Sequence, residues 1–390
     1  MKITAVKTFL VDGVFRPWTF VKVETDEGTV GWGDCTDWDA APAIAATVEL
    51  LGERMIGKDP MRAEEAWWSL IGYMQRQNGG IAYKAASGID SALWDIRGKV
   101  LNAPVWQLLG GKMRDELRMY WTHCVSNRAR YADALGVPAV RNTDDIRKMC
   151  EEIKEKGYTA LKTNIFALDD VPGSEKLGRS MGASSGHQAT PIALRSAQAI
   201  VGTLREELGP DVGIALDTAL NFRLGGAIKL ARTLEPYDMM WLETETFDPG
   251  SLRTVRESTT TTICTGESLF GIEGYKPFLE KYAQDVIMPD FAWNGVTMGR
   301  KVCDLALAYD TPIAPHNCHS PMNTLVSANI CASIKNFYVF EFDEDDAPWR
   351  DDLLTHPFEI NNGYLKVPDR PGLGSDLIES ELKKHAWTGY

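Results

Sequence analysis

Short apolar runs that are typical of β-strands alternate with segments of helical period from about residue 116 onward. Eight such runs occur, at residues 117–124, 159–165, 212–217, 239–243, 262–267, 285–290, 312–316 and 337–341. Helix-like segments lie between them, for example residues 145–157, 191–209 and 299–310. Strand–helix alternation at this spacing predicts a parallel sheet, and eight units predict a closed (β/α) barrel.

The residues before the barrel have a different pattern. Residues 3–34 alternate like a strand meander, and residues 81–100 repeat apolar side chains every three or four positions. We therefore predict an α+β domain over residues 1–115, a barrel over residues 116–350, and a Pro- and Gly-rich segment over residues 351–390 that returns to the first domain. A length of 390 residues fits a barrel of about 250 residues with a smaller partner.

Charge and cysteine content restrict the class of protein. The net charge of −13 argues against nucleic acid and anionic membranes as partners, although a local cationic pocket could still bind a small anionic substrate. The sequence lacks a signal peptide pattern and any apolar run of about 18 residues. Seven scattered cysteines without a CxxC pair favour reduced thiols. We expect a cytoplasmic protein.

Ionisable side chains end the last six β-like runs. They are Asp217, Glu243, Glu267, Asp290, His316 and Glu341, which follow one another at intervals of 23–26 residues. Polar residues at the carboxyl ends of barrel strands converge on one cavity. One such residue could simply cap the following helix, but six in register favour a functional site.

Three of these side chains predict a metal site. Asp217, Glu243 and Glu267 would repel one another in one cavity unless a cation joined them. Oxygen ligands alone suit Mg²⁺, with Mn²⁺ as the plausible substitute, and Zn²⁺ fits less well because Cys and His are not clustered there.

The next two strand ends predict a general base. A carboxylate such as Asp290 beside His316 would fix the imidazole tautomer and raise its basicity. The alternatives are a buried histidine satisfied by a neighbour, or a metal bound by His316 with His319. Lys162, at the end of an apolar strand, could pair with a substrate carboxylate or a developing enediolate.

Several motifs carry a resemblance to a known family. They are ASGIDSALWDIRGK (86–99), LLGG (108–111), WLE (241–243), TGES (265–268) and APHN (314–317). With these motifs the chain resembles the enolase superfamily, in its mandelate racemase/muconate lactonizing enzyme-like branch.

The resemblance implies a modified (β/α)₇β barrel capped by the first domain, and a homo-oligomer. It also implies that Asp217, Glu243 and Glu267 bind Mg²⁺, and that Asp290 and His316 form the His–Asp dyad. Glu341 then matches the acid that hydrogen-bonds the substrate carboxylate from the side away from the metal. For Glu341 we expect a raised pKa, because its surroundings are acidic.

Two departures from the family pattern bear on the reaction. Asn164 stands where racemase-type members carry a second lysine, and Asn cannot remove a proton. Ala219 stands where some sugar-acid dehydratases carry a histidine acid. One strong base, His316, remains, and a dehydratase needs only one: loss of the α-proton and of the β-hydroxyl gives an enol and then a 2-keto acid. Protonated His316 and Lys162 are the candidate acids.

The predicted function is therefore a Mg²⁺-dependent dehydratase of carbohydrate catabolism. Residues 349–357 and 162–166 are similar to those of tartrate and sugar-acid dehydratases, which implies a small anionic carboxylate as substrate. An epimerase or racemase on the same scaffold and a non-catalytic metal-binding barrel are the alternatives.

Further residues are candidates for substrate binding. The long loop over residues 166–191 is either a substrate-contacting lid or a disordered insertion. Arg16 and Trp18 could instead be a solvated arginine and a core tryptophan. The full set of candidate substrate contacts is Asn164, Arg16, Trp18, Asn294 and His319.

Overall fold

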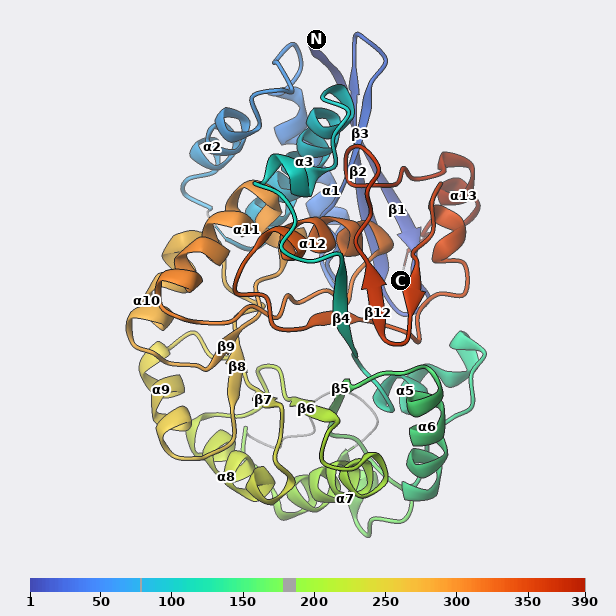
Figure 1. The fold of residues 1–390 in the computed structure, drawn as a ribbon, viewed down its shortest axis with the longest axis vertical. Coiled ribbons are helices and arrows are strands. Elements are labelled where there is room, and N and C mark those ends of the chain that lie inside the picture. Colours follow the sequence, from blue (N-terminus) through green and yellow to red (C-terminus); the bar gives the residue numbers. More distant parts are fainter. Residues whose placement is uncertain (78, 178–186, 390) are drawn as a thin grey trace.

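The computed structural model describes residues 1–77, 79–177 and 187–389. A three-stranded sheet with its helices lies at one end of the molecule, and a barrel surrounded by helices lies at the other (Figure 1). The predicted fold class, a modified barrel with an N-terminal α+β cap, is confirmed. Part of the long loop, residues 178–186, lies outside the described residues.

The cap consists of an antiparallel meander and helices packed on it. Its elements are β1 (Ile3–Asp12), β2 (Pro17–Thr25), β3 (Val30–Asp34), α1 (Ala41–Glu53), α2 (Ala63–Tyr73), α3 (Gly80–Val100) and α4 (Val105–Leu108). Helix α3 lies so close to β3 that a Cβ on Gly33 would lie 2.0 Å from the carbonyl oxygen of Gly88. Glycine at this strand position therefore allows the helix to pack against the sheet.

The barrel follows the predicted order of strands and helices. Its elements are β4 (Glu116–Trp121), α5 (Ser126–Leu135), α6 (Thr143–Glu155), β5 (Ala160–Asn164), α7 (Pro191–Leu208), β6 (Gly213–Asp217), α8 (Leu224–Leu234), β7 (Trp241–Glu243), α9 (Pro249–Glu257), β8 (Ile263–Thr265), α10 (Gly271–Glu280), β9 (Val286–Ile287), α11 (Phe291–Ala308), α12 (Pro321–Ser333) and β10 (Phe340–Phe342). Strands β4 to β9 pair in parallel in sequence order, and β10 pairs with β4 to close the ring.

One predicted strand is reduced to bridges. Within residues 312–316, Ile313 forms single parallel bridges with Ile287 and with Phe337. Pro312 and Pro315 flank it and have no backbone N–H to donate, so a regular ladder cannot form there. The ring still closes through these bridges.

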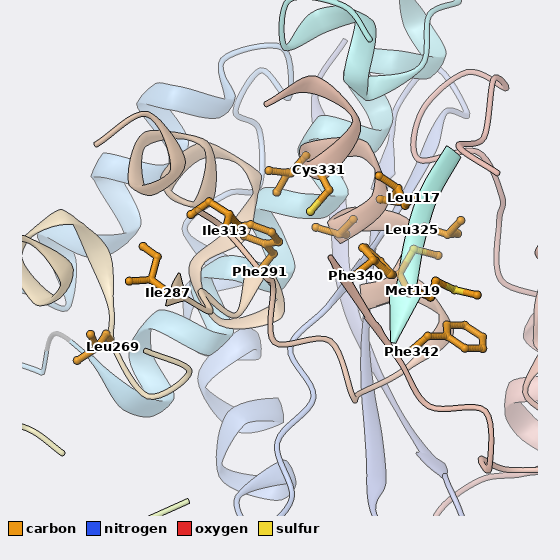
Figure 2. Close-up of a cluster of buried hydrophobic side chains, with 14 of the residues drawn as sticks. Leu117, Met119, Leu269, Ile287, Phe291, Ile313, Leu325, Cys331, Phe340 and Phe342 are labelled. Carbon is orange, nitrogen blue, oxygen red and sulfur yellow. The ribbon is translucent and has the colours of Figure 1, made fainter. Parts of the chain in front are cut away.

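The seam between β4 and β10 is closed by apolar side chains. Phe340 of β10 is the register partner of Met119 of β4, and both are fully buried. Figure 2 shows them in a cluster with Phe342 and Leu117. Burying each such side chain contributes about 1.5–3 kcal/mol, so this cluster fixes the first and last strands and the side chains at their ends.

The C-terminal segment has more structure than its composition predicts. It contains β11 (Ile360–Asn361), β12 (Tyr364–Lys366) and α13 (Glu379–Lys384). Strand β12 pairs antiparallel with β4, and the chain then runs beside β1, where the backbone N–H of Asp12 donates to the carbonyl of His385 at 2.8 Å (Figure 1). The division of the chain at residues 115 and 350 stays a prediction.

Helices α3 and α11 join the cap to the barrel. Asp90 of α3 accepts hydrogen bonds from the backbone N–H and the hydroxyl of Thr297, at 2.8 and 2.6 Å. Trp94 donates to the same hydroxyl at 2.8 Å. These contacts fix the cap over the barrel. Within the described part of the chain, no helix combines the length and apolarity that a membrane span requires.

Candidate active site

The predicted strand-end residues lie at one end of the barrel. Asp217 and Glu243 are register partners at the ends of β6 and β7. Glu267 follows β8 by two residues, and Asp290 bridges His316 in parallel. All are buried or, for Glu267, partly buried. A sequence spacing of one strand–helix unit has therefore placed these groups around one centre.

Each carboxylate of the predicted metal triad has a different polar partner. Asp217 accepts from the Asn164 side chain at 2.9 Å and from the backbone N–H of Ala219 at 2.7 Å. Glu243 pairs with Lys162 at 3.0 Å, and Glu267 lies 3.4 Å from Nε2 of His316. The triad is not among the groups of described residues whose ligand atoms all lie within 4.8 Å of one another.

Two carboxyl groups of the triad have raised pKa values, which indicates that too little positive charge lies beside them. Burial raises the pKa of Glu243; Lys162 opposes this rise, and Asp217 and Glu267 add to it, leaving the pKa well above its usual value. Burial also raises the pKa of Glu267, to about 7, against the effect of His316. A hard divalent cation bound to these oxygen donors would stabilise their anionic form and so lower the raised pKa values.

Lys162 lies between two carboxylates. Its Nζ is 3.0 Å from Glu243 and 2.8 Å from Glu341, and the side chain is buried. Burial alone would lower the pKa of Lys162, but the two carboxylates outweigh it and hold the pKa well above its usual value. The side chain is therefore a fixed cation in the site.

The expected raised pKa of Glu341 is wrong. One carboxylate oxygen accepts from Lys162 and from the Thr122 hydroxyl at 2.6 Å, and the other accepts from the backbone N–H of Asn317 at 2.6 Å. Burial would raise the pKa, but Lys162, His316 and these hydrogen bonds hold it well below its usual range. The sequence identified the acidic neighbours but not the cation placed against this carboxylate.

His316 is oriented by Asp290. Its Nδ1 lies 2.6 Å from Oδ2 of Asp290, so Nε2 is the ring nitrogen that can take a proton. Burial would lower the pKa of His316, but Cys318, Glu267 and Asp290 together raise it well above its usual value. Burial would raise the pKa of Asp290, but His319 and His316 outweigh burial and lower this pKa to about 2.

His319 shares the carboxylate that holds His316. Its Nε2 lies 2.7 Å from the same oxygen of Asp290. Asp290, His316 and His319 form one of two groups of described residues whose possible ligand atoms lie within 4.8 Å of one another; His316, Cys318 and Glu341 form the other. His319 is therefore a second partner of Asp290, beside His316.

The other candidate substrate contacts occupy varied positions. Asn164 accepts from Arg130 at 2.6 Å and donates to Asp217, so it links a cation to a triad carboxylate. Arg16 donates to the carbonyl of His319 at 2.9 Å. Trp18 is fully buried in β2. Asn294 uses its amide for hydrogen bonds with the backbone of Gly271, Leu269 and Asp290.

A cavity of about 320 Å³ opens onto these groups. Its lining contains Lys162, Asp217, Glu267 and His316, together with residues not singled out from the sequence: Asp37, Trp38, Asp39, His123, Trp293 and Cys318. The cap loop after β3 supplies the first three of these, so both parts of the chain form the cavity. His123 is the second-last residue of the first β-like run, and extending the strand-end argument to that run would have found it.

Two family descriptions match the sequence. Residues 14–110 match "Mandelate racemase / muconate lactonizing enzyme, N-terminal domain", and residues 145–381 match "Enolase C-terminal domain-like". The chain is 33% identical to D-xylonate dehydratase of Haloferax volcanii, over 100% of this chain and 90% of the relative. It is 30% identical to D-galactonate dehydratase of Cronobacter sakazakii, over 98% and 94%.

A solved structure shares the fold over nearly the whole chain. It is a Burkholderia xenovorans protein, provisionally named an L-alanine-DL-glutamate epimerase, bound to magnesium and fumarate. The two chains are 35% identical and superpose with a TM-score of 0.92, over 99% of this chain and 96% of the other.

Proposed function

Because the chain belongs to the mandelate racemase/muconate lactonizing enzyme family of the enolase superfamily, we propose that it is a Mg²⁺-dependent dehydratase of a hydroxylated carboxylic acid. The observation that carries the proposal is that His316, oriented by Asp290, lines the same cavity as Asp217, Glu267 and Lys162. A base and a cation-binding set in one cavity suit removal of a proton next to a carboxylate.

Asp217, Glu243 and Glu267 would hold the metal ion. The donor set is oxygen only, and the raised pKa values of Glu243 and Glu267 are consistent with a cation at this place. When bound, Mg²⁺ supplies positive charge that stabilises the enediolate. Mn²⁺ is the proposed substitute, since it accepts the same oxygen donors.

The side chains then divide the work. Nε2 of His316 takes the α-proton, and Asp290 keeps the ring in the required tautomer. Lys162 places a fixed positive charge where the substrate carboxylate gains electron density. Because Glu341 is held as an anion, we propose that it acts through Lys162 and does not hydrogen-bond the substrate carboxylate as an acid.

A single base favours dehydration over racemisation. Asn164 occupies the position of a possible second base and is engaged by Arg130 and Asp217. An epimerase is the second candidate, because a structure 35% identical to this chain carries an epimerase name. The relatives named D-xylonate and D-galactonate dehydratase support a sugar acid as substrate.

Three further properties belong to the proposal. A cytoplasmic location is supported by seven cysteines that are all free and buried. A homo-oligomer is proposed from the family alone. Arg16 and His319 would contribute to substrate binding indirectly. Arg16 donates to the His319 carbonyl, and His319 contacts Asp290.

The test is a screen of mono- and diacid sugars, including D-xylonate, D-galactonate and tartrate, for Mg²⁺-dependent formation of a 2-keto acid. Activity that chelation of Mg²⁺ removes and that the His316→Asn variant lacks would support the proposal. Exchange of the α-proton in D₂O without a keto acid would instead support the epimerase. Neither activity with any acid would count against both.

A further inference from the structure

His123 is a second histidine in the cavity, without a role in the reaction as described above. It follows β4 by two residues and lines the cavity with Lys162 and His316. In the ring, β4 lies between β5 and β10, whereas β6, β7 and β8 carry the metal-binding carboxylates on the other side. His123 therefore lies in the part of the ring away from these carboxylates.

The side chain of Asp343 contacts Nδ1 of His123, the same ring nitrogen that contacts Asp290 in His316. Nδ1 of His123 lies 3.1 Å from Oδ2 of Asp343. The other oxygen of Asp343 accepts from the Asn127 side chain at 3.2 Å. This pairing uses Nδ1 and leaves Nε2 as the ring nitrogen for a ligand in the cavity.

The backbone of His123 is held in an uncommon conformation. Its φ is +46°, in the left-handed region, which histidine adopts more readily than most residues. Its carbonyl accepts from the backbone N–H of Asn127 at 2.9 Å and from the Ser126 hydroxyl at 3.1 Å. Residues held in such backbone conformations are concentrated at functional sites.

The imidazole ring of His123 is uncharged at neutral pH. Burial, helped by Arg130 and Lys162, lowers the pKa of His123 to about 3. Burial raises the pKa of Asp343 to about 7, against the effect of Arg16, which lies 3.8 Å away. The raised pKa lets Asp343 carry a proton and donate it to Nδ1, and in that form the neutral ring presents an N–H at Nε2.

We propose that His123, held by Asp343, hydrogen-bonds the departing β-hydroxyl of the substrate and gives it a proton. The inference rests on the proposed dehydratase function. His316 removes the α-proton, the C–H electron pair forms the new C=C bond, and the C–O bond breaks with its pair on oxygen. That oxygen takes the Nε2 proton and leaves as water, while Nδ1 takes the proton of Asp343. To restore the pair, Nε2 takes a proton from solvent and Nδ1 returns its proton to Asp343.

Lys162 is a poorer donor for this step. Its ammonium is shared between Glu243 and Glu341, and these contacts raise its pKa. Loss of its proton would leave two buried carboxylates unpaired. His123 carries no such cost, because its ring stays neutral throughout.

The test compares two leaving groups. The His123→Gln and Asp343→Asn variants are assayed on D-xylonate, or on the acid that the wild type dehydrates, and on its 3-deoxy-3-fluoro analogue. Fluoride leaves without a proton, whereas hydroxide needs one. We expect His123→Gln to lower kcat for water loss about 100-fold or more and kcat for fluoride loss less than about 5-fold. Asp343→Asn should show the same contrast, to a smaller degree.

Exchange of the α-proton in D₂O gives a second readout. It should persist in both variants, because His316 is untouched. Equal losses for water, fluoride and exchange would overturn the proposal in favour of a structural role, and unchanged water loss would also overturn it. A wild type that eliminates neither group would instead contradict the dehydratase function itself.

Discussion

Nδ1 of His316 lies 2.6 Å from Oδ2 of Asp290, and this contact orients the ring of the proposed base. Asp290 and His316 also form a parallel β-bridge between two neighbouring segments of the barrel, although they are far apart in the sequence. The carboxylate keeps a proton on Nδ1, so Nε2 is the ring nitrogen that points away from Asp290 and exchanges its proton.

Replacing Asp290 with asparagine should lower kcat about 10²–10⁴-fold, because an amide can hold the wrong tautomer of His316. Steady-state kinetics at saturating Mg²⁺ measures this. The Mg²⁺-induced increase in thermal stability should remain, since Asp290 is not in the carboxylate triad. A variant with near wild-type kcat would show that the dyad does not serve catalysis.

Mg²⁺ should stabilise the folded protein. At 100 times its Kd, a ligand that binds only the folded state adds about 2.7 kcal/mol. Calorimetric melting with and without Mg²⁺ should show this gain in the wild type and its loss in Asp217→Asn and Glu267→Gln. Glu245→Gln is the matched control, because Glu245 is a buried carboxylate already bonded to Thr265 and Gly266. Equal gains in all variants would place the ion elsewhere.

Lys162→Met should destabilise the metal-free protein by about 3–5 kcal/mol, because it leaves Glu243 and Glu341 buried without their cation. Urea denaturation in the presence of a chelator measures the change. The Lys162→Arg variant keeps the positive charge, so its free energy of unfolding should fall by less. A loss below about 1 kcal/mol for the methionine variant would mean that this ammonium does not hold the site together.

Asp90 should make stability depend on pH. Burial raises its pKa from 3.8 to about 7 in the folded protein, despite the hydrogen bonds from Thr297. The folded state therefore binds the extra proton between about pH 4 and pH 7, and the free energy of unfolding falls as pH rises through that window. At about 1.4 kcal/mol per pKa unit, the contribution amounts to a few kcal/mol.

The Asp90→Asn variant tests this pH dependence. Its stability relative to wild type should rise from pH 4 to pH 8 by a few kcal/mol, as urea denaturation across that range can measure. The exposed Asp304→Asn serves as the control and should show no such trend. Parallel curves for Asp90→Asn and wild type would contradict the raised pKa.

The fold could be predicted from the sequence because its signal is periodic. Strand-end residues such as Asp217 and Glu243 recur at the spacing of one strand–helix unit, and a barrel brings such positions together. The strand at Ile313 was overestimated, because its apolar character predicts burial but its flanking prolines forbid a ladder.

The electrostatics and the cap contribution could not be predicted in this way. Spacing along one chain cannot show that Lys162 reaches Glu341, so the direction of the Glu341 pKa was wrong. Trp38 reaches the cavity only because α3 packs on α11 and carries the cap over the barrel. Such contacts depend on packing between distant elements, and no local pattern encodes them.

The central claim is that His316 removes the proton beside the substrate carboxylate and that water then leaves. The most direct measurement is mass and NMR analysis of the product formed from D-xylonate, or the best acid of the screen, in D₂O with Mg²⁺. We predict a 2-keto-3-deoxy acid carrying one deuterium at C3, absent with His316→Asn or with a chelator. Recovered substrate that carries deuterium at C2, with no keto acid, would contradict dehydration, and equal product from the His316→Asn variant would contradict the assigned base.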